Sequence, residues 1–155
     1  MHAIVSEAIV TPDGVRPGAV LVDGDRIVAV RDRPPPGVPR EDLGELVVSP
    51  GIVDCHVHVN QPGRTEWEGF FTATRAAAAG GVTTLVDMPL NCRPVTTSAA
   101  ALETKLASLE GELHVDVGFW GGVVPGNGPD LPGLAAAGVL GAKAFLCHSG
   151  IDDFP

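Results

Sequence analysis

The stretch Ser49-Pro-Gly-Ile-Val-Asp-Cys-His-Val-His58 decides the fold expected for this chain. It reads as a short apolar strand that carries His56 and His58 at its end. Side chains alternate across a β-strand, so positions i and i+2 point the same way. Two neutral imidazoles aimed at one point are a natural pair of metal ligands. The alternative is two incidental histidines near a strand end, because His-x-His spacing alone is common.

Downstream of Pro50, apolar strands alternate with helical stretches, a pattern typical of a parallel sheet covered on both faces. A parallel barrel needs eight such units and about 250 residues, and this chain supplies half of that. The expected fold class is therefore α/β, with residues 49–155 forming the first half of a (β/α)8 TIM barrel that is truncated at Pro155. The expected strands are 51–58, 82–87, 113–120 and 139–145. One helix is expected to begin at 65–68, and two more are expected to span 98–110 and 130–137.

Residues 1–48 predict a separate small β unit made of short strands and turns. The segment Asp23-Gly-Asp25 lies between two apolar runs and is typical of a hairpin turn. We expect this unit to be antiparallel.

Helical periodicity predicts which side chains of the second unit are buried. Thr65 and Glu68 have the spacing of a capping box. Lys105 is expected on the exposed side of its helix and His114 in a structural position. The side chains expected to face the core are Trp67, Phe70, Phe71, Thr74, Ala78, Leu102, Leu106, Leu109 and Trp120.

Polar residues follow several predicted strands at their carboxyl ends, where the active sites of parallel barrels lie. Asp87 closes the second strand, and Lys143 lies in the fourth, within an apolar run. A buried ammonium is costly, which favours a neutral amine that can react with carbon dioxide to form a carbamate. Such a carbamate is suited to bridge two cations. The alternative is a buried stem with its charged head in solvent.

Two loop residues are candidates for substrate contact. Asn91 and Arg64 both follow strand ends, over the expected site. An asparagine can pair with a substrate amide through both of its polar groups. Each residue could instead belong to a turn or to the surface.

Composition limits the possible partners. The 155 residues carry 10 basic and 19 acidic side chains, a net charge of −9. A nucleic-acid or membrane-surface protein would show a basic face, so neither partner is expected. The chain begins without the features of a signal peptide, and its three cysteines lack metal-finger spacing. Both features favour a cytoplasmic protein with reduced thiols.

The segment 50–58 resembles the first metal motif of the amidohydrolase superfamily. Three later blocks are similar to the allantoinases of its cyclic amidohydrolase group: Asn60-Gln-Pro-Gly-Arg-Thr-Glu-Trp-Glu-Gly69 with Ala79–Asn91, then Asp116–Asn127, then Gly141–Leu146 with Ser149-Gly150. The resemblance covers the chain from about residue 3 onward. It departs at Gln61, where the family often has an acidic residue.

The resemblance implies a metal-dependent (β/α)8 barrel with two divalent ions, usually zinc, plus a small composite β-sandwich domain, residues 1–48 here, formed by both chain ends. His56 and His58 would bind one ion, and carbamylated Lys143 would bridge both. Two later histidines and the catalytic aspartate would lie beyond Pro155, and this part alone would be inactive. The substrate would be a small cyclic ureide, opened from allantoin to allantoate in purine catabolism, and the full-length protein would be a homo-oligomer, often a tetramer.

Asn60 helps to choose among the relatives that the resemblance leaves open. Dihydroorotases usually carry an arginine at this position, which grips the substrate carboxylate. Allantoin is neutral, so an arginine there would lack its anion. Asn60 therefore favours the allantoinases over the dihydroorotases. Asn60, Arg64 and Asn91 are the expected substrate-binding residues. The remaining alternatives are a dihydropyrimidinase or hydantoinase, a dihydroorotase-like enzyme, an inactive scaffold, and a genuine short protein.

Overall fold

The computed structural model describes residues 1–109, 111 and 113–155. These residues form two compact units, Met1–Pro50 and Gly51–Pro155. The structure does not test the predicted division into a composite β domain and half a barrel as domains of a complete protein, and that division stays a prediction.

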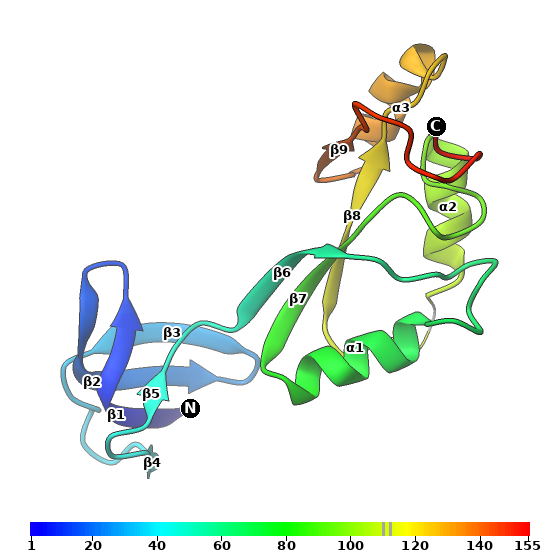
Figure 1. Ribbon diagram of the computed structural model, residues 1–155. Coiled ribbons are helices and arrows are strands. Elements are labelled where there is room, and N and C mark those ends of the chain that lie inside the picture. Colours follow the sequence, from blue (N-terminus) through cyan, green and yellow to red (C-terminus); the bar gives the residue numbers. More distant parts are fainter. Residues whose placement is uncertain (110, 112) are drawn as a thin grey trace. The chain divides into compact units, whose positions relative to one another are not determined.

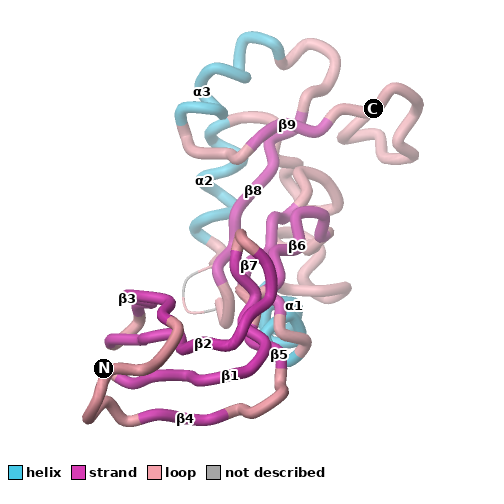
Figure 2. Tube along the Cα trace, turned by 90° about the vertical axis from the view of Figure 1, so that its left-hand side faces the viewer, coloured by secondary structure: helices cyan, strands magenta, loops and turns pink. Residues whose placement is uncertain are grey.

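The first unit is a five-stranded sheet, and residues 1–50, all of which are described, contain strands and loops but no helix (Figure 2). Its strands are β1 (His2–Thr11), β2 (Gly14–Asp23), β3 (Arg26–Arg31), β4 (Arg40–Asp42) and β5 (Val47–Val48). The order is β3-β2-β1-β4, with β5 also paired to β1. The predicted hairpin is present, since β2 and β3 pair antiparallel.

The prediction of a purely antiparallel first unit is wrong, because β4 and β5 both run parallel to β1. No apolar pattern indicates β4, which consists of Arg40, Glu41 and Asp42 and is fully exposed. Its pairing rests on the backbone, which the side-chain pattern does not reveal.

The second unit is a parallel sheet with helices between its strands (Figure 1). The strands, in the order β6-β7-β8-β9, are β6 (Ile52–Val57), β7 (Val82–Asp87), β8 (Asp116–Gly122) and β9 (Gly141–Lys143). The helices are α1 (Phe70–Ala79), α2 (Ala99–Ala107), the 3-10 turn η1 (Gly128–Asp130) and α3 (Leu131–Ala136). Every pair of neighbouring strands is parallel, as the alternating pattern predicts.

The core of this unit lies where the helices meet the sheet. Each α-helix contributes a buried apolar side chain, and Phe119 comes from β8. The cluster consists of Val59, Phe70, Leu102, Leu109, Phe119 and Leu134. It packs the α-helices against the strands.

The predicted start of the first helix is wrong. The helix begins at Phe70, and its N-cap, Gly69, makes no side-chain hydrogen bond. The carbonyl oxygen of the Gln61 side chain accepts from the Phe70 amide at 3.0 Å instead. Thr65 and Glu68 therefore lie in the preceding turns and form no capping box.

Other boundaries differ by a few residues. The third strand begins at Asp116 rather than 113, and the fourth spans only Gly141–Lys143. The helix predicted over 98–110 ends at Ala107, and residue 110 lies outside the described residues. Its start is as expected, because the Ser98 hydroxyl accepts from the Ala101 amide at 3.2 Å.

Close approach of β9 to β8 requires a glycine at position 141. A Cβ there would lie 2.2 Å from the Trp120 ring. That ring cannot retreat easily, because its Nε1–H donates to the Cys55 carbonyl of β6 at 2.9 Å. Trp120 thus links two strands that are not neighbours in the sheet, and Gly141 leaves room for it.

We expect Gly141→Ala to destabilise the full-length protein by ~1–3 kcal/mol through overpacking. Gly133→Ala is the matched control, because nothing lies within 4 Å of its added methyl. Within a helix this control should gain ~0.5–1 kcal/mol. Thermal unfolding of both variants checks the expectation, and equal melting temperatures would contradict it.

Candidate functional site

His56 and His58 lie at the carboxyl end of β6, where the sequence predicts a metal pair. His56 is within the strand and exposed, and His58 follows one residue beyond its end and is half-buried. Their ring centroids are 5.4 Å apart with an interplanar angle of 42°. The two imidazoles are therefore close neighbours on one side of the strand end.

The surroundings of His58 favour its neutral form. Burial lowers the pKa of His58 below its ordinary value, and the charges of His56, Lys143 and Lys105 lower it further. A neutral imidazole is the form that binds metal. The effect of Lys143 also shows that this lysine of β9 lies near a histidine that follows β6.

Lys143 ends β9 and is half-buried. Its Nζ lies 4.7 Å from the centre of the Phe145 ring. Its backbone is fixed, because the Lys143 carbonyl accepts from the Val123 amide at 2.8 Å. The side chain therefore comes from a defined strand end, with its stem against an aromatic ring.

Asn91 connects His58 to Arg64. The side-chain amide nitrogen of Asn91 lies 3.4 Å from Nδ1 of His58. The backbone carbonyl of Asn91 accepts a hydrogen bond from the Arg64 guanidinium at 3.4 Å. Asn91 has φ of +75°, a left-handed conformation that asparagine tolerates better than most residues. The structure thus brings together both predicted loop residues and one histidine.

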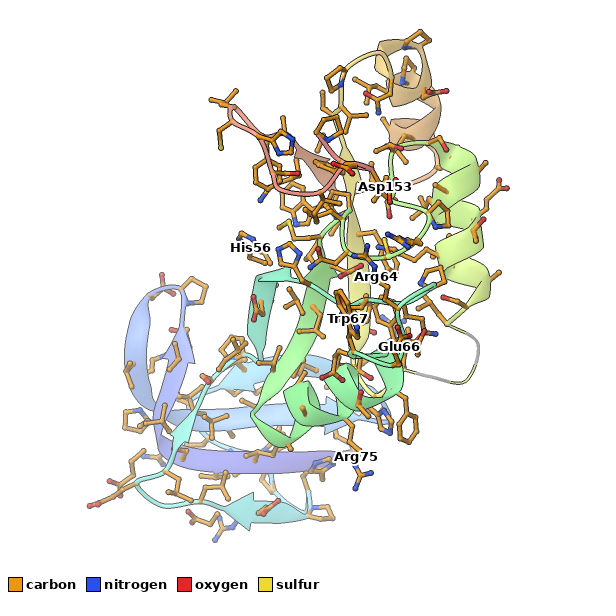
Figure 3. The ribbon with its side chains drawn as sticks, turned by 45° about the vertical axis from the view of Figure 1, so that its right-hand side comes forward. His56, Arg64, Glu66, Trp67, Arg75 and Asp153 are labelled. Carbon is orange, nitrogen blue, oxygen red and sulfur yellow. The ribbon has the colours of Figure 1, made fainter. Side chains whose placement is uncertain are left out.

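Arg64 faces Trp67, whose ring centre lies 5.0 Å from the guanidinium carbon (Figure 3). Trp67 is 65% exposed, so the prediction that it belongs to the core is wrong. It lies in the turns before α1 rather than on the helix, and its neighbour is a charged side chain. The pair lines a pocket of about 490 Å³ with Asn91, Arg93 and residues 150–153.

Asn60 and Gln61 lie in the loop that follows His58, and both are buried. The Asn60 backbone amide donates to the Glu68 carbonyl, and the Asn60 backbone carbonyl accepts from the Arg64 backbone amide, both at 3.0 Å. The Gln61 side chain accepts from Phe70 and donates to the Ser108 carbonyl at 2.5 Å. A carboxylate at position 61 could not donate to Ser108, so the departure from the family pattern has a structural use here.

Lys105 is the residue that the sequence reasoning placed wrongly. It is fully buried rather than exposed, and its Nζ donates to Oδ2 of Asp87 at 2.6 Å, with both side chains at 0% exposure. Lys105 lies three residues after Leu102 and four before Leu109, which are both buried. That spacing places it on the core face, whereas the expected core residue Leu106 is 44% exposed.

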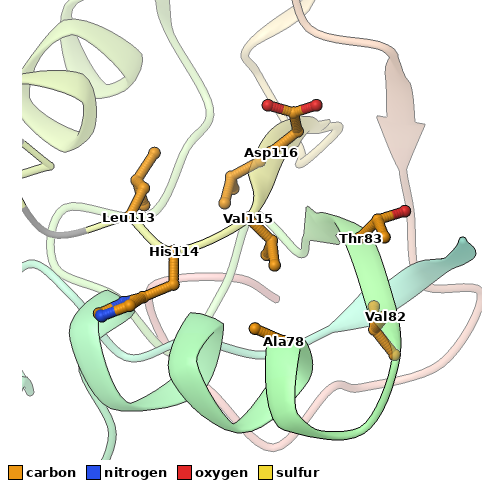
Figure 4. Close-up of a pocket in the computed structure, with 8 residues that line it drawn as sticks. Ala78, Val82, Thr83, Leu113, His114, Val115 and Asp116 are labelled. Atoms are coloured by element: carbon orange, nitrogen blue, oxygen red, sulfur yellow. The ribbon is translucent and has the colours of Figure 1, made fainter. Parts of the chain in front are cut away.

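A second hollow, of about 900 Å³, lies far from this chemistry (Figure 4). It is lined at the amino ends of β7 and β8 by Val82, Thr83 and Asp116, with Ala78 and His114. Parallel barrels carry their active sites at the opposite strand ends. His114 packs its ring on Phe71 at 4.8 Å between centroids, as expected of a structural residue.

Within residues 1–109, 111 and 113–155, no three His, Cys, Asp or Glu side chains gather as a metal-binding group. The described helices also lack the length and apolar character needed to cross a bilayer. His56 and His58, with Lys143, Asn91 and Arg64, are the candidate site residues in this part of the chain.

The fold and the candidate site together are a parallel β/α sheet with paired histidines at the end of its first strand, an arrangement suited to a metal-dependent enzyme. The model of the amidohydrolase family matches residues 47–137, so the chain belongs to the amidohydrolase family. It is 57% identical over 153 residues to the allantoinase of Streptomyces avermitilis, and 51% identical over 165 residues to the allantoinase of Arabidopsis thaliana. These alignments cover 97% and 98% of this chain but 34% and 32% of those proteins, so the chain spans about a third of their length.

Solved structures show the same relationship. The L-hydantoinase (dihydropyrimidinase) from Arthrobacter aurescens superposes with a TM-score of 0.85 at 28% identity. The superposition covers 100% of this chain and 35% of the hydantoinase chain. The predicted fold class is confirmed: the sheet β6–β9 with its helices is part of an amidohydrolase barrel.

The Asp87 carboxyl predicts a specific dependence of stability on pH. Burial raises the pKa of Asp87 from 3.8 to about 6, although Lys105 opposes the rise. The folded state then binds more protons than the unfolded state between these values, so this group's contribution to stability falls as pH rises from about 4 to 6. We expect the melting-temperature difference between the metal-free full-length protein and its Asp87→Asn variant to decrease across that range.

Melting curves at several pH values check the sign of this effect. A difference that grows from pH 4 to 6 would contradict it, because it would mean that Lys105 holds the pKa of Asp87 below its ordinary value. Asp116→Asn, which removes an exposed carboxyl at the other end of the sheet, is the control.

Proposed function

We propose that the full-length protein is an allantoinase, a metal-dependent hydrolase that opens the ring of allantoin to give allantoate in purine catabolism. The observation that supports this proposal is that His56 and His58 lie at the carboxyl end of β6 and Lys143 lies at the carboxyl end of β9. The substrate class rests on the similarity to allantoinases along nearly the whole chain. The family acts on small molecules and is metal-dependent in general.

The histidine pair fits a metal ion. Zn–N bonds of ~2.1 Å in a tetrahedral site place two ligating imidazole centroids ~5 Å apart. The observed separation is 5.4 Å. Burial lowers the pKa of His58, which favours the unprotonated nitrogen that a metal ligand needs. The donor chemistry suits zinc, and we propose two divalent ions.

In this proposal His56 and His58 hold one ion and Lys143, as a carbamate, holds both. The carbamate turns a half-buried amine into a carboxylate next to the cations, which removes the repulsion that an ammonium would feel. When bound, the metal supplies a nucleophile at neutral pH and polarises the scissile carbonyl. The remaining ligands, two histidines and an aspartate that moves the proton, would come from the chain beyond Pro155.

Three side chains would orient the substrate. Asn91 can offer both its amide N–H and its carbonyl oxygen to a ureide, and it already contacts His58. Arg64 lies beside Trp67. Asn60 is 9% exposed, so its proposed contact depends on an opening of the loop that follows His58.

A hydantoinase is the second candidate, because the structural neighbour with a TM-score of 0.85 bears that name. The five-membered ureide rings of hydantoin and allantoin present the same amide to the metal. The side chains of Arg64 and Asn91 would distinguish them through the ureido group that only allantoin carries. A dihydroorotase is disfavoured, because Asn60 stands where an arginine would bind the carboxylate of that substrate.

Two further properties belong to the proposal. Cys55, Cys92 and Cys147 are all unpaired, which suits a cytoplasmic protein. A homo-oligomer, such as a tetramer, would be the working form of the full-length protein.

We expect the full-length protein to hydrolyse allantoin, and His58→Ala to lower kcat/KM at least ~100-fold through loss of a metal ligand. His2→Ala, which removes an exposed histidine of β1, is the matched control and should keep full activity. Bound metal measured on the same samples should fall together with activity. Normal turnover by His58→Ala would contradict the assigned role.

Lys143→Ala should be equally inactive, with partial recovery on addition of a short carboxylic acid such as propionate. A free carboxylate can occupy the space of the missing carbamate and supply the same oxygen ligands. Recovery by propionate supports the carbamate, whereas recovery by propylamine alone would support a role for the ammonium. Rates on hydantoin, dihydrouracil and dihydroorotate, measured in parallel, decide between the candidate functions.

A further inference from the structure

The second unit buries one ion pair completely. Lys105 of α2 and Asp87 at the end of β7 are the two charged residues among the buried residues that the structure describes, and their ionic groups lie 2.6 Å apart. Each partner also binds elsewhere: Oδ1 of Asp87 accepts from the Val59 amide at 2.7 Å, and Nζ of Lys105 lies 3.4 Å from the Met88 carbonyl.

These bonds surround His58. The Val59 amide, directly after His58, is bound to the Asp87 side chain. The Val57 carbonyl, directly before it, accepts from the Met88 amide at 2.7 Å. The backbone on both sides of the histidine is therefore fastened to two consecutive residues, Asp87 and Met88. Lys105 contacts both of them.

Stability alone does not explain such a pair. Removing two charges from water costs several kcal/mol per ion, and apolar replacements of similar volume are often as stable or more so. An apolar pair, however, could not bind the Val59 amide, and a lone aspartate would bring an uncompensated charge into the core. The pair supplies an acceptor for the backbone next to His58 while keeping the local net charge at zero.

We propose that Asp87 and Lys105 are positioning residues that hold the His58 backbone in the geometry required for metal binding. This inference rests on the proposed function, since it assumes that His56 and His58 bind metal. Asp87 holds the turn after β6 through its bond to the Val59 amide, and Lys105 orients the Asp87 carboxylate through the ion pair. Neither residue needs to touch metal or substrate.

Metal affinity of the full-length protein, measured by titrating the metal-free form with Co²⁺ and following its visible absorption, tests the proposal. Lys105→Met should weaken Co²⁺ binding ~10–100-fold, the range expected when a partner of the ligands is lost. Asp87→Ala, which removes the acceptor for Val59, should do the same. The double variant Asp87→Asn/Lys105→Met should regain most of the affinity, because the asparagine oxygen can accept from the Val59 amide and no unpaired charge is left in the core.

Leu102→Ala is the matched control. Leu102 is buried in the same helix one turn before Lys105 and makes no polar contact with the His58 turn. It should lower the melting temperature and leave Co²⁺ affinity unchanged. The same loss of affinity in Leu102→Ala, or wild-type affinity in folded Lys105→Met and Asp87→Ala, would overturn the proposal.

An error in the proposed function and an error in the positioning role would give different results. If the wild-type protein binds no Co²⁺ and hydrolyses no allantoin, the proposed function itself is wrong. If the wild type does both and the double variant binds no better than Lys105→Met, the metal site stands and the positioning role is overturned. Should Lys105→Met not fold, the double variant and Asp87→Ala still give the comparison.

Discussion

The contact between Asp87 and the backbone beside His58 is the constraint on which the site depends. β6 ends at Val57, so His58 lies just outside the strand, where hydrogen bonds of the sheet no longer hold it. Its position is set by the bonds that Asp87 and Met88 make to its two neighbours. The bond to Val59 uses a carboxylate oxygen deep in the core, and Lys105 of the following helix supplies the cation that neutralises it.

The same logic links the other strands to the site. Trp120 of β8 reaches across to the Cys55 carbonyl of β6, and Gly141 leaves room for its ring beneath β9. Gln61 fastens the loop after His58 to the start of α1 and to the end of α2. These hydrogen bonds hold the backbone around the two histidines, while Arg64 and Asn91 lie in the loops that follow β6 and β7. A rigid frame with functional groups at its edge suits a metal site, which tolerates small errors in ligand position poorly.

The sequence predicted the parallel β/α pattern because four apolar strands alternate with helical periods, and this pattern survives small errors in each boundary. It also placed the histidine pair at the end of a strand and Asn91 in the loop after the next strand, which is where the structure has them. It failed where one side chain depends on another that is distant in sequence. A lysine in a helix is ordinarily solvent-exposed, and only its ion pair with Asp87 explains why Lys105 is buried. The Thr65–Glu68 spacing is typical of a capping box, but the Gln61 side chain accepts from the first helical amide instead. β4 is held by backbone pairing to β1, which its charged side chains do not show.

The central claim is that His56, His58 and Lys143 form part of one metal centre. Anomalous diffraction from crystals of the full-length protein, recorded on both sides of the zinc absorption edge, tests it most directly. The account predicts an anomalous peak within ~2.1 Å of a ring nitrogen of both histidines, and a carbamate on Lys143 shared with a second peak. Metal bound at another place, or an unmodified Lys143 in protein that hydrolyses allantoin, would contradict it.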